Sequence, residues 1–142
     1  KTAFENDEIE LKNAFINQMK WPKNANIPYF TRGNNELISR IGKEMYKGIT
    51  ATANGFYGPQ GRSLRLATEV PDLNEQLNQF NFKNQKITNF EMETSALYFL
   101  GRSLGHNTLT ICAIIANRIS KKYSTNPIDT IDVLINEVLK NL

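Results

Sequence analysis

Apolar residues recur at helical spacing in separate segments of the chain. In the segment 7–20, Ile9, Phe15, Ile16 and Met19 fall on one side of a helix that Asp7 can cap. The same spacing, bounded by proline or glycine, predicts further helices. These cover residues 33–43, a segment that begins at 71, residues 94–104 and residues 129–142. Each helix would bury one face and leave the other in solvent.

The predicted helices supply most of the expected core. In the helix that begins at 71, the face expected to be buried consists of Leu73, Leu77 and Phe80. In the helix 94–104 it consists of Ala96, Leu97, Leu100 and Leu104, and in the last helix of Ile131, Leu134, Ile135, Val138 and Leu142. At 142 residues the chain is long enough to bury most of its apolar surface as one domain, residues 1–142.

Segments rich in β-branched residues lie between the helices and predict strands. Residues 47–54 end at Gly55, and residues 86–90 form a shorter segment bounded by polar residues. Residues 108–116 are almost continuously apolar or β-branched, which is typical of a strand covered on both faces. Residues 63–69 are a weaker candidate for a short strand. Strands that alternate with helices indicate an α/β layer fold.

Composition narrows the class of protein. Hydrophobic residues make up 40% and charged residues 22% of the chain, as in ordinary soluble domains. We expect no membrane association, because no apolar run approaches a membrane span and no signal-peptide pattern opens the chain. The single cysteine, Cys112, sits in an apolar run, which predicts a core thiol and a reducing, cytoplasmic compartment. The net charge of +3 is scattered, so nucleic acid is a poor candidate partner, and one His and one Cys leave no credible zinc site.

An unusual loop, residues 55–62, follows the first predicted strand. It reads Gly-Phe-Tyr-Gly-Pro-Gln-Gly-Arg, and three glycines and a proline in eight residues exclude both helix and strand. Phe56 offers a flat surface, Gln60 a donor beside an acceptor, and Arg62 several donors in a plane. These groups suit a flat, oxygen-rich heterocycle such as uracil. The alternative is a glycine- and proline-rich turn with incidental side chains.

Polar and aromatic side chains follow all three main predicted strands at the same end. The second strand ends in Phe90, Glu91, Met92 and Glu93, and the third ends in Asn117 and Arg118. In α/β sheets, ligands bind beyond the carboxyl ends of the strands. If the strands are parallel, these side chains converge with the loop 55–62 on one crevice.

Glu91 and Glu93 form a pair where a strand gives way to a helix. A carboxylate there can accept hydrogen bonds from the vicinal diol of a ribose, and the helix N-terminus would keep it ionised. The alternative is that Glu93 is a first-turn helix acid and Glu91 a surface charge. His106 lies in a polar turn and is expected to be an exposed loop residue. No Ser-His-Asp set can be assembled, so no catalytic residue is assigned.

Three motifs resemble those of the nucleoside phosphorylase family, in particular its uridine phosphorylase branch. They are the loop 55–62, Asn-Phe-Glu-Met-Glu-Thr at 89–94 and Ile-Ile-Ala-Asn-Arg at 114–118. Their order and separation match as well, and the resemblance runs from about residue 33 to the end. Purine-directed relatives usually carry Asp where Asn117 stands. The resemblance implies part of a three-layer α/β fold with a mixed central sheet flanked by helices.

The resemblance also implies roles for individual residues. Base contacts would come from Phe56, Gln60, Arg62 and Arg118. Ribose contacts would come from Phe90, Glu91, Met92 and Glu93, with Glu93 on the hydroxyl groups. The reaction would be reversible phosphorolysis of uridine to uracil and ribose 1-phosphate. Phosphate would be the co-substrate, and no organic cofactor is expected.

The family's phosphate site, a glycine-rich loop with several arginines, has no match in these residues. The resemblance therefore implies the C-terminal, base- and ribose-binding half of a phosphorylase. We expect it to work with the phosphate-binding N-terminal half, in a homo-oligomer. A half-sheet would leave one edge and an apolar face uncovered. Two other interpretations stay open: a non-catalytic nucleoside-binding or assembly module, and a purine nucleoside phosphorylase or nucleosidase.

Overall fold

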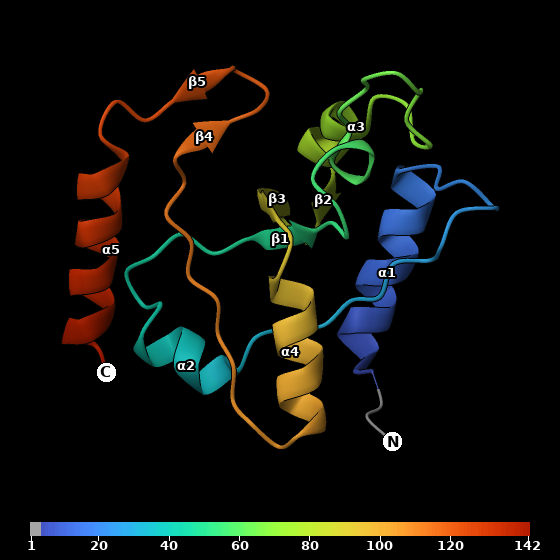
Figure 1. Ribbon diagram of the computed structural model, residues 1–142. Helices are drawn as coiled ribbons and strands as arrows, with labels where there is room; N and C mark the ends of the chain where they lie inside the picture. Colours follow the sequence, from blue (N-terminus) through green and yellow to red (C-terminus); the bar gives the residue numbers. More distant parts are fainter. Residues whose placement is uncertain (1–3) are drawn as a thin grey trace.

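Helices and short strands alternate along the chain in the computed structural model, which describes residues 4–142 (Figure 1). The helices are α1 (Asn6–Gln18), α2 (Asn35–Arg40), α3 (Leu73–Gln79), α4 (Thr94–Ser103) and α5 (Pro127–Lys140). The strands are β1 (Ile49–Thr52), β2 (Asn81–Phe82), β3 (Gln85–Glu91), β4 (Ala116–Asn117) and β5 (Lys122–Tyr123). A short 3₁₀ helix, η1 (Gly58–Gln60), lies within the loop 55–62. The five predicted helices and the first two predicted strands are confirmed, with shifted ends.

The main sheet is mixed and has the strand order β1-β3-β2. β1 runs parallel to β3, with Thr52 opposite Glu91 at the carboxyl end of both strands. β2 and β3 form an antiparallel hairpin, and β2 was not predicted from the sequence. Its turn residues, Lys83 and Asn84, have φ of 49° and 65°, the backbone that suits a tight hairpin turn. The predicted α/β class with a mixed sheet and helices is confirmed.

The hydrophobic core lies between α1, α3 and the sheet. Its buried members are Phe15, Met19, Val70, Leu73, Leu77 and Phe80. The rings of Phe15 and Phe80 are 5.4 Å apart in an edge-to-face arrangement. The inward face predicted for the helix that begins at 71 is confirmed. None of the helices in residues 4–142 is both long and apolar enough to cross a membrane.

Polar contacts attach α4 to this packed part. Glu8 of α1 is buried, and its carboxylate lies 3.0 Å from Arg102 of α4. The same carboxylate accepts the backbone N–H of Arg32 at 3.0 Å and of Glu5 at 2.8 Å. A buried carboxylate with this many donors holds three chain segments in one place.

Two predicted strands are wrong. Residues 108–115 form no strand, and only Ala116–Asn117 pairs, with Lys122–Tyr123. The N–H of Thr110 donates to the Tyr98 hydroxyl at 2.9 Å, so a side chain takes the place of a neighbouring strand. Residues 63–69 also form no strand, because local contacts such as that from the Ser63 hydroxyl to the Leu66 carbonyl turn the chain.

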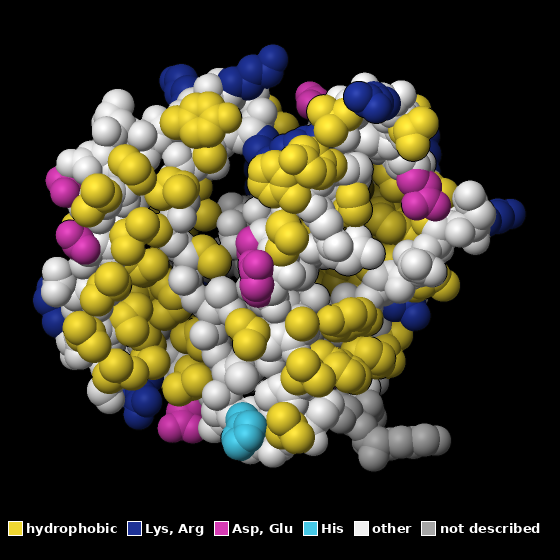
Figure 2. Space-filling model, viewed as in Figure 1, with side chains coloured by type: hydrophobic (Ala, Val, Ile, Leu, Met, Phe, Trp, Pro, Cys, Tyr) yellow, Lys and Arg dark blue, Asp and Glu magenta, His cyan; other side chains and the backbone are white. Residues whose placement is uncertain are grey.

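The apolar faces predicted for α4 and α5 are not buried. Leu97, Leu100 and Leu104 are more than half exposed, Ala96 is exposed, and α4 faces the molecule with Thr94 and Gly101 instead. In α5 no residue is buried: Ile131 and Ile135 are exposed, whereas Leu134 and Val138 are half-buried. Leu142, which was predicted to share this face, lies beyond the end of α5 and is also exposed. α5 stands at one side of the molecule (Figure 1), and hydrophobic side chains gather on that side of the surface (Figure 2). Within residues 4–142, no segment covers these faces.

Candidate active site

The loop 55–62 is a compact turn that places one amide inside the molecule. Its backbone closes through hydrogen bonds from Gly61 to Gly58 at 2.8 Å and from Arg62 to Tyr57 at 3.0 Å. Gly61 has φ of 72°, a conformation that favours glycine. The turn buries Gln60, which is only 2% exposed, although amide side chains are mostly found at the surface.

Two guanidinium groups converge on the Gln60 side chain. Its Oε1 atom accepts a hydrogen bond from Arg62 Nη1 at 2.7 Å and another from Arg118 Nη2. Arg118 Nη1 also donates to the Gln60 carbonyl at 3.3 Å. The two arginines occupy Oε1, the acceptor of this amide, and its NH₂ group is the donor.

Each guanidinium also lies over an aromatic ring. Arg62 is 3.9 Å from the ring centroid of Phe56, and Arg118 is 4.8 Å from that of Phe90. Burial, and then the charge of Arg62, lower the pKa of Arg118. The cluster of Phe56, Gln60, Arg62, Phe90 and Arg118, here called the base cluster, combines flat surfaces with donors of positive charge.

The acidic turn, residues 91–93, lies at the end of β3 and has one inner and one outer carboxylate. Glu91 is half-buried, and its carboxylate accepts the Thr52 hydroxyl at 2.6 Å and the N–H groups of Glu93 and Thr94 at 2.8 and 2.7 Å. Burial alone would raise the pKa of Glu91, but these hydrogen bonds outweigh it and keep the pKa below its usual 4.5. Glu93 is exposed, and among the hydrogen bonds found in residues 4–142 its carboxylate accepts only the N–H of Met92, at 3.1 Å. Met92 is also exposed.

The structure therefore divides the predicted site residues into two neighbouring groups. The base cluster brings together side chains from the loop 55–62, from β3 and from Arg118, which directly follows β4. The acidic turn follows Phe90 directly, so β3 carries residues of both groups. Asn117 lies apart from both groups in its contacts, since its side chain accepts the N–H groups of Ile119 and Ser120 and closes a local turn.

Two residues near the acidic turn differ from expectation. Cys112 was predicted to be a core thiol, but it is exposed, because residues 108–115 do not join the sheet. Its Sγ atom lies 3.2 Å from Asn89 Nδ2, and its partial burial, followed by the charge of Glu91, raises its pKa.

Thr52 was not singled out as a site residue, although a hydroxyl at the last position of a strand is a usable signal. His106 is exposed in its loop, as predicted.

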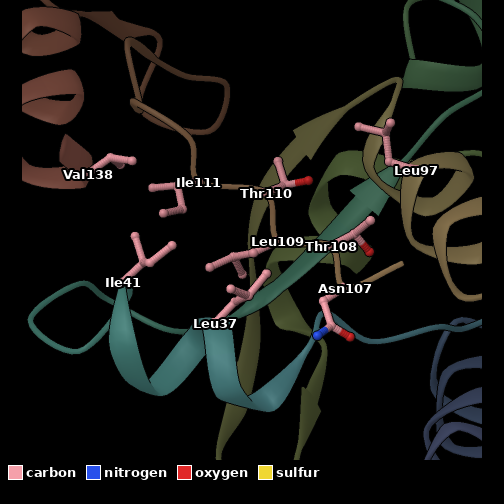
Figure 3. Close-up of a pocket in the computed structure, with 9 residues that line it drawn as sticks. All are labelled: Leu37, Ile41, Leu97, Asn107, Thr108, Leu109, Thr110, Ile111 and Val138. Carbon is pink, nitrogen blue, oxygen red and sulfur yellow. The ribbon is translucent and has the colours of Figure 1, made fainter. Parts of the chain in front are cut away.

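One hollow reaches the base cluster, and a second lies beside α2 and α5. The first, of about 1770 Å³, opens beside β1 and reaches Thr52, Arg62 and Phe90. The second, of about 370 Å³, is lined mainly by apolar side chains of α2, α5 and residues 107–111, and Leu37, Ile41, Ile111 and Val138 surround its gap (Figure 3). The second hollow has no charged group in its lining. The first is lined by Arg62 and Phe90 of the base cluster, whereas Gln60, Arg118 and Glu93 are not among its lining residues. Within residues 4–142, no three His, Cys, Asp or Glu side chains are grouped as metal ligands would be.

Comparison with known proteins gives one family. The profile of the Phosphorylase superfamily matches residues 11–139. A uridine phosphorylase of Thermococcus kodakarensis is 32% identical over 94 residues, which are 62% of this chain and 31% of the relative. The chain thus spans about a third of the length of that curated relative. No solved structure matches the chain at a significant level.

Proposed function

This chain belongs to the phosphorylase superfamily, and on that basis we propose that it supplies base and ribose recognition in a uridine phosphorylase. The reaction would be the reversible phosphorolysis of uridine, in which phosphate displaces uracil from C1′ and ribose 1-phosphate forms. Phosphate would be the co-substrate, and no organic cofactor takes part. The 32% identity to a uridine phosphorylase supports the pyrimidine substrate. A nucleoside-salvage role would place the protein in the cytoplasm.

The observation that carries this proposal is the buried amide of Gln60 between two guanidinium groups. Uracil has a flat face and two carbonyl oxygens, and it leaves with negative charge. The Gln60 NH₂ group and the free N–H groups of Arg62 and Arg118 would donate to those oxygens as the charge develops. The rings of Phe56 and Phe90 would supply the flat surfaces.

The acidic turn would orient the sugar. Glu93, which is exposed, would accept hydrogen bonds from the ribose hydroxyl groups, with Met92 and Phe90 packing against the nucleoside. A carboxylate at this position would also favour the positive charge that develops on the sugar ring. Phosphate would attack C1′ from the side of the sugar opposite the leaving uracil.

We place the phosphate site in a part of the enzyme outside these 142 residues, which would also complete a three-layer fold. The support is that the chain spans about a third of its relative, and that apolar residues of α4 and α5 are exposed. Such large apolar surfaces usually mark an interface. Leu100 of α4 and Ile135 and Leu139 of α5 would be covered there. By resemblance to its family, the complete enzyme would be a homo-oligomer.

Calorimetric titration of the chain with uridine, uracil and phosphate tests this proposal. We expect binding of uridine and uracil without binding of phosphate. Gln60→Ala should weaken uracil binding at least tenfold, whereas Gln79→Ala, an exposed glutamine of α3, should leave it unchanged. If the folded chain binds neither uridine nor uracil, the proposed recognition of base and ribose is wrong. If it binds inosine more tightly than uridine, a purine enzyme is favoured. Phosphate binding would contradict the placement of the phosphate site elsewhere.

A further inference from the structure

Thr52 and Glu91 form a hydrogen-bonded pair across the carboxyl ends of β1 and β3. They are direct neighbours in the parallel register, and the Thr52 hydroxyl donates to Glu91 Oε1 at 2.6 Å. The same hydroxyl accepts the N–H of Ser95 at 3.1 Å. Both side chains are half-buried, so this contact is protected from bulk water.

The pair also takes up the first free N–H groups of α4. A helix leaves its first N–H groups without partners, and here Glu91 accepts those of Glu93 and Thr94 while Thr52 accepts that of Ser95. Negative charge is favourable at this end of a helix. The Glu91 carboxylate is therefore occupied on both oxygens by donors of the protein itself.

The pair joins two groups of site residues that are far apart in sequence. Thr52 is three residues before Gly55, which opens the loop of the base cluster. Glu91 is two residues before Glu93 and holds its backbone N–H directly. A shift at either residue would move the acidic turn relative to the loop 55–62.

We propose that Thr52 and Glu91 are positioning residues that fix Glu93 at the ribose, and that Glu91 does not itself touch the sugar. This inference rests on the proposed function. For Glu91 to hold the ribose hydroxyl groups, it would have to release its bonds to Thr52, Glu93 and Thr94. Glu93 reaches the ribose without that loss, because its carboxylate is exposed.

The test compares Thr52→Val with Thr52→Ser in the complete enzyme that contains this chain. Valine keeps the shape and removes the hydroxyl, and serine keeps the hydroxyl. We expect Thr52→Val to lower kcat/KM for uridine about tenfold, in line with loss of one hydrogen bond to a charged group. Thr52→Ser and Thr50→Val, a matched change two residues earlier on β1, should stay within about twofold of the parent.

A substrate without ribose hydroxyl groups separates positioning from general damage. With 2′,3′-dideoxyuridine, Thr52→Val should have the same kcat/KM as the parent, because this substrate has no 2′ or 3′ hydroxyl group to donate a hydrogen bond to Glu93. Thr52→Val combined with Glu93→Gln should be no worse on uridine than Glu93→Gln alone. If Thr52→Val loses kcat/KM equally on both substrates, or loses none on uridine, the positioning role is overturned. If Glu91→Gln lowers kcat/KM for uridine further when Glu93→Gln is already present, Glu91 contacts the sugar. That result would overturn the claim that Glu91 does not touch it.

Amide hydrogen exchange supplies a readout that does not depend on activity. Thr52→Val should speed exchange at the Ser95 amide, whereas Thr50→Val should not. If amide exchange at Ser95 is unchanged in Thr52→Val, the Thr52 hydroxyl does not hold the start of α4. A parent enzyme with no activity on uridine would instead refute the proposed function, and the positioning role with it, even if exchange changes as expected.

Discussion

The two sides of this molecule carry similar apolar patterns but differ in burial. On one side, Met19 after α1 and Phe80 after α3 are each only 2% exposed. On the other side, Ile135 and Leu139 of α5 are 49% and 62% exposed, and α5 has no buried residue. α5 nevertheless has a broad apolar face, with Ile128 and Ile131 beside those two residues.

This difference teaches that an amphipathic pattern shows which face of a helix can be buried, but not what covers it. α1 and α3 meet each other and the sheet, and their apolar residues gain the free energy of leaving water, about 25 cal/mol per Å². The exposed leucines of α4 and the apolar face of α5 meet no such surface in residues 4–142. α4 is held by polar contacts, among them Glu8 to Arg102 and Thr52 to Ser95, and by Phe99, whose ring centroid lies 5.6 Å from that of Tyr29.

The largest expected effect comes from a change in the packed side. Phe80→Ala should lower the free energy of unfolding by about 3–5 kcal/mol, because it removes a buried ring and leaves a cavity. Ile135→Ala, the matched change on α5, should alter it by about 0.5 kcal/mol or less, because this side chain already meets water. Urea unfolding of both variants measures the two values.

If Phe80→Ala and Ile135→Ala lower the free energy of unfolding equally, the difference in burial between the two sides is contradicted. This outcome would mean that α5 packs in solution against something that this structure does not show. A self-association that lowers the exposure of α5 would produce that result, and it would appear as a dependence of stability on protein concentration.

Much of the packed side could be predicted from the sequence, because its elements are local and their partners are within the chain. Leu73, Leu77 and Phe80 have helical spacing and do face the core. The segment 108–115 could not be predicted correctly in the same way. Its β-branched run favours a strand, but a strand also needs a neighbouring edge, and the Thr110 N–H finds the Tyr98 hydroxyl instead.

The candidate site shows the same limit. The loop 55–62 stood out by composition, and the structure brings its Gln60 and Arg62 together with Arg118 from 58 residues away. The different environments of Glu91 and Glu93 could not be read from spacing. They depend on the register of β1 against β3, which sets Thr52 opposite Glu91.

A smaller effect is expected from the polar contacts that join the two sides. Glu8→Gln should lower the free energy of unfolding by about 1.5–3 kcal/mol, because the buried carboxylate bonds a guanidinium and two backbone N–H groups. Glu10→Gln is the control on the same helix. Its carboxylate pairs with Lys83 at 2.6 Å, but both side chains are more than half exposed, so about 1 kcal/mol or less is expected.

Thermal or urea unfolding would measure both variants, and amide exchange in α4 would locate the loss. Faster exchange in α4 of Glu8→Gln, with α3 unchanged at matched stability, would support the polar attachment of α4. A Glu8→Gln variant as stable as Glu10→Gln would mean that α4 is held by other contacts.

The smallest effect is a pH dependence at the acidic turn. Hydrogen bonds from Thr52, Glu93 and Thr94 lower the pKa of Glu91 in the folded chain below its usual 4.5, despite its burial. A lowered pKa means that ionised Glu91 stabilises the fold above about pH 4.5, and that this contribution is lost as the pH falls through the folded pKa. The stability gap between the parent and Glu91→Gln, measured by urea unfolding between about pH 3 and 7, should therefore narrow towards the acid end. Glu75→Gln, an exposed carboxylate of α3, is the control for general charge effects. A gap that stays constant or widens as the pH falls would contradict the role of the charged Glu91 in holding α4, and would leave the Thr52 hydroxyl as the contact that matters there.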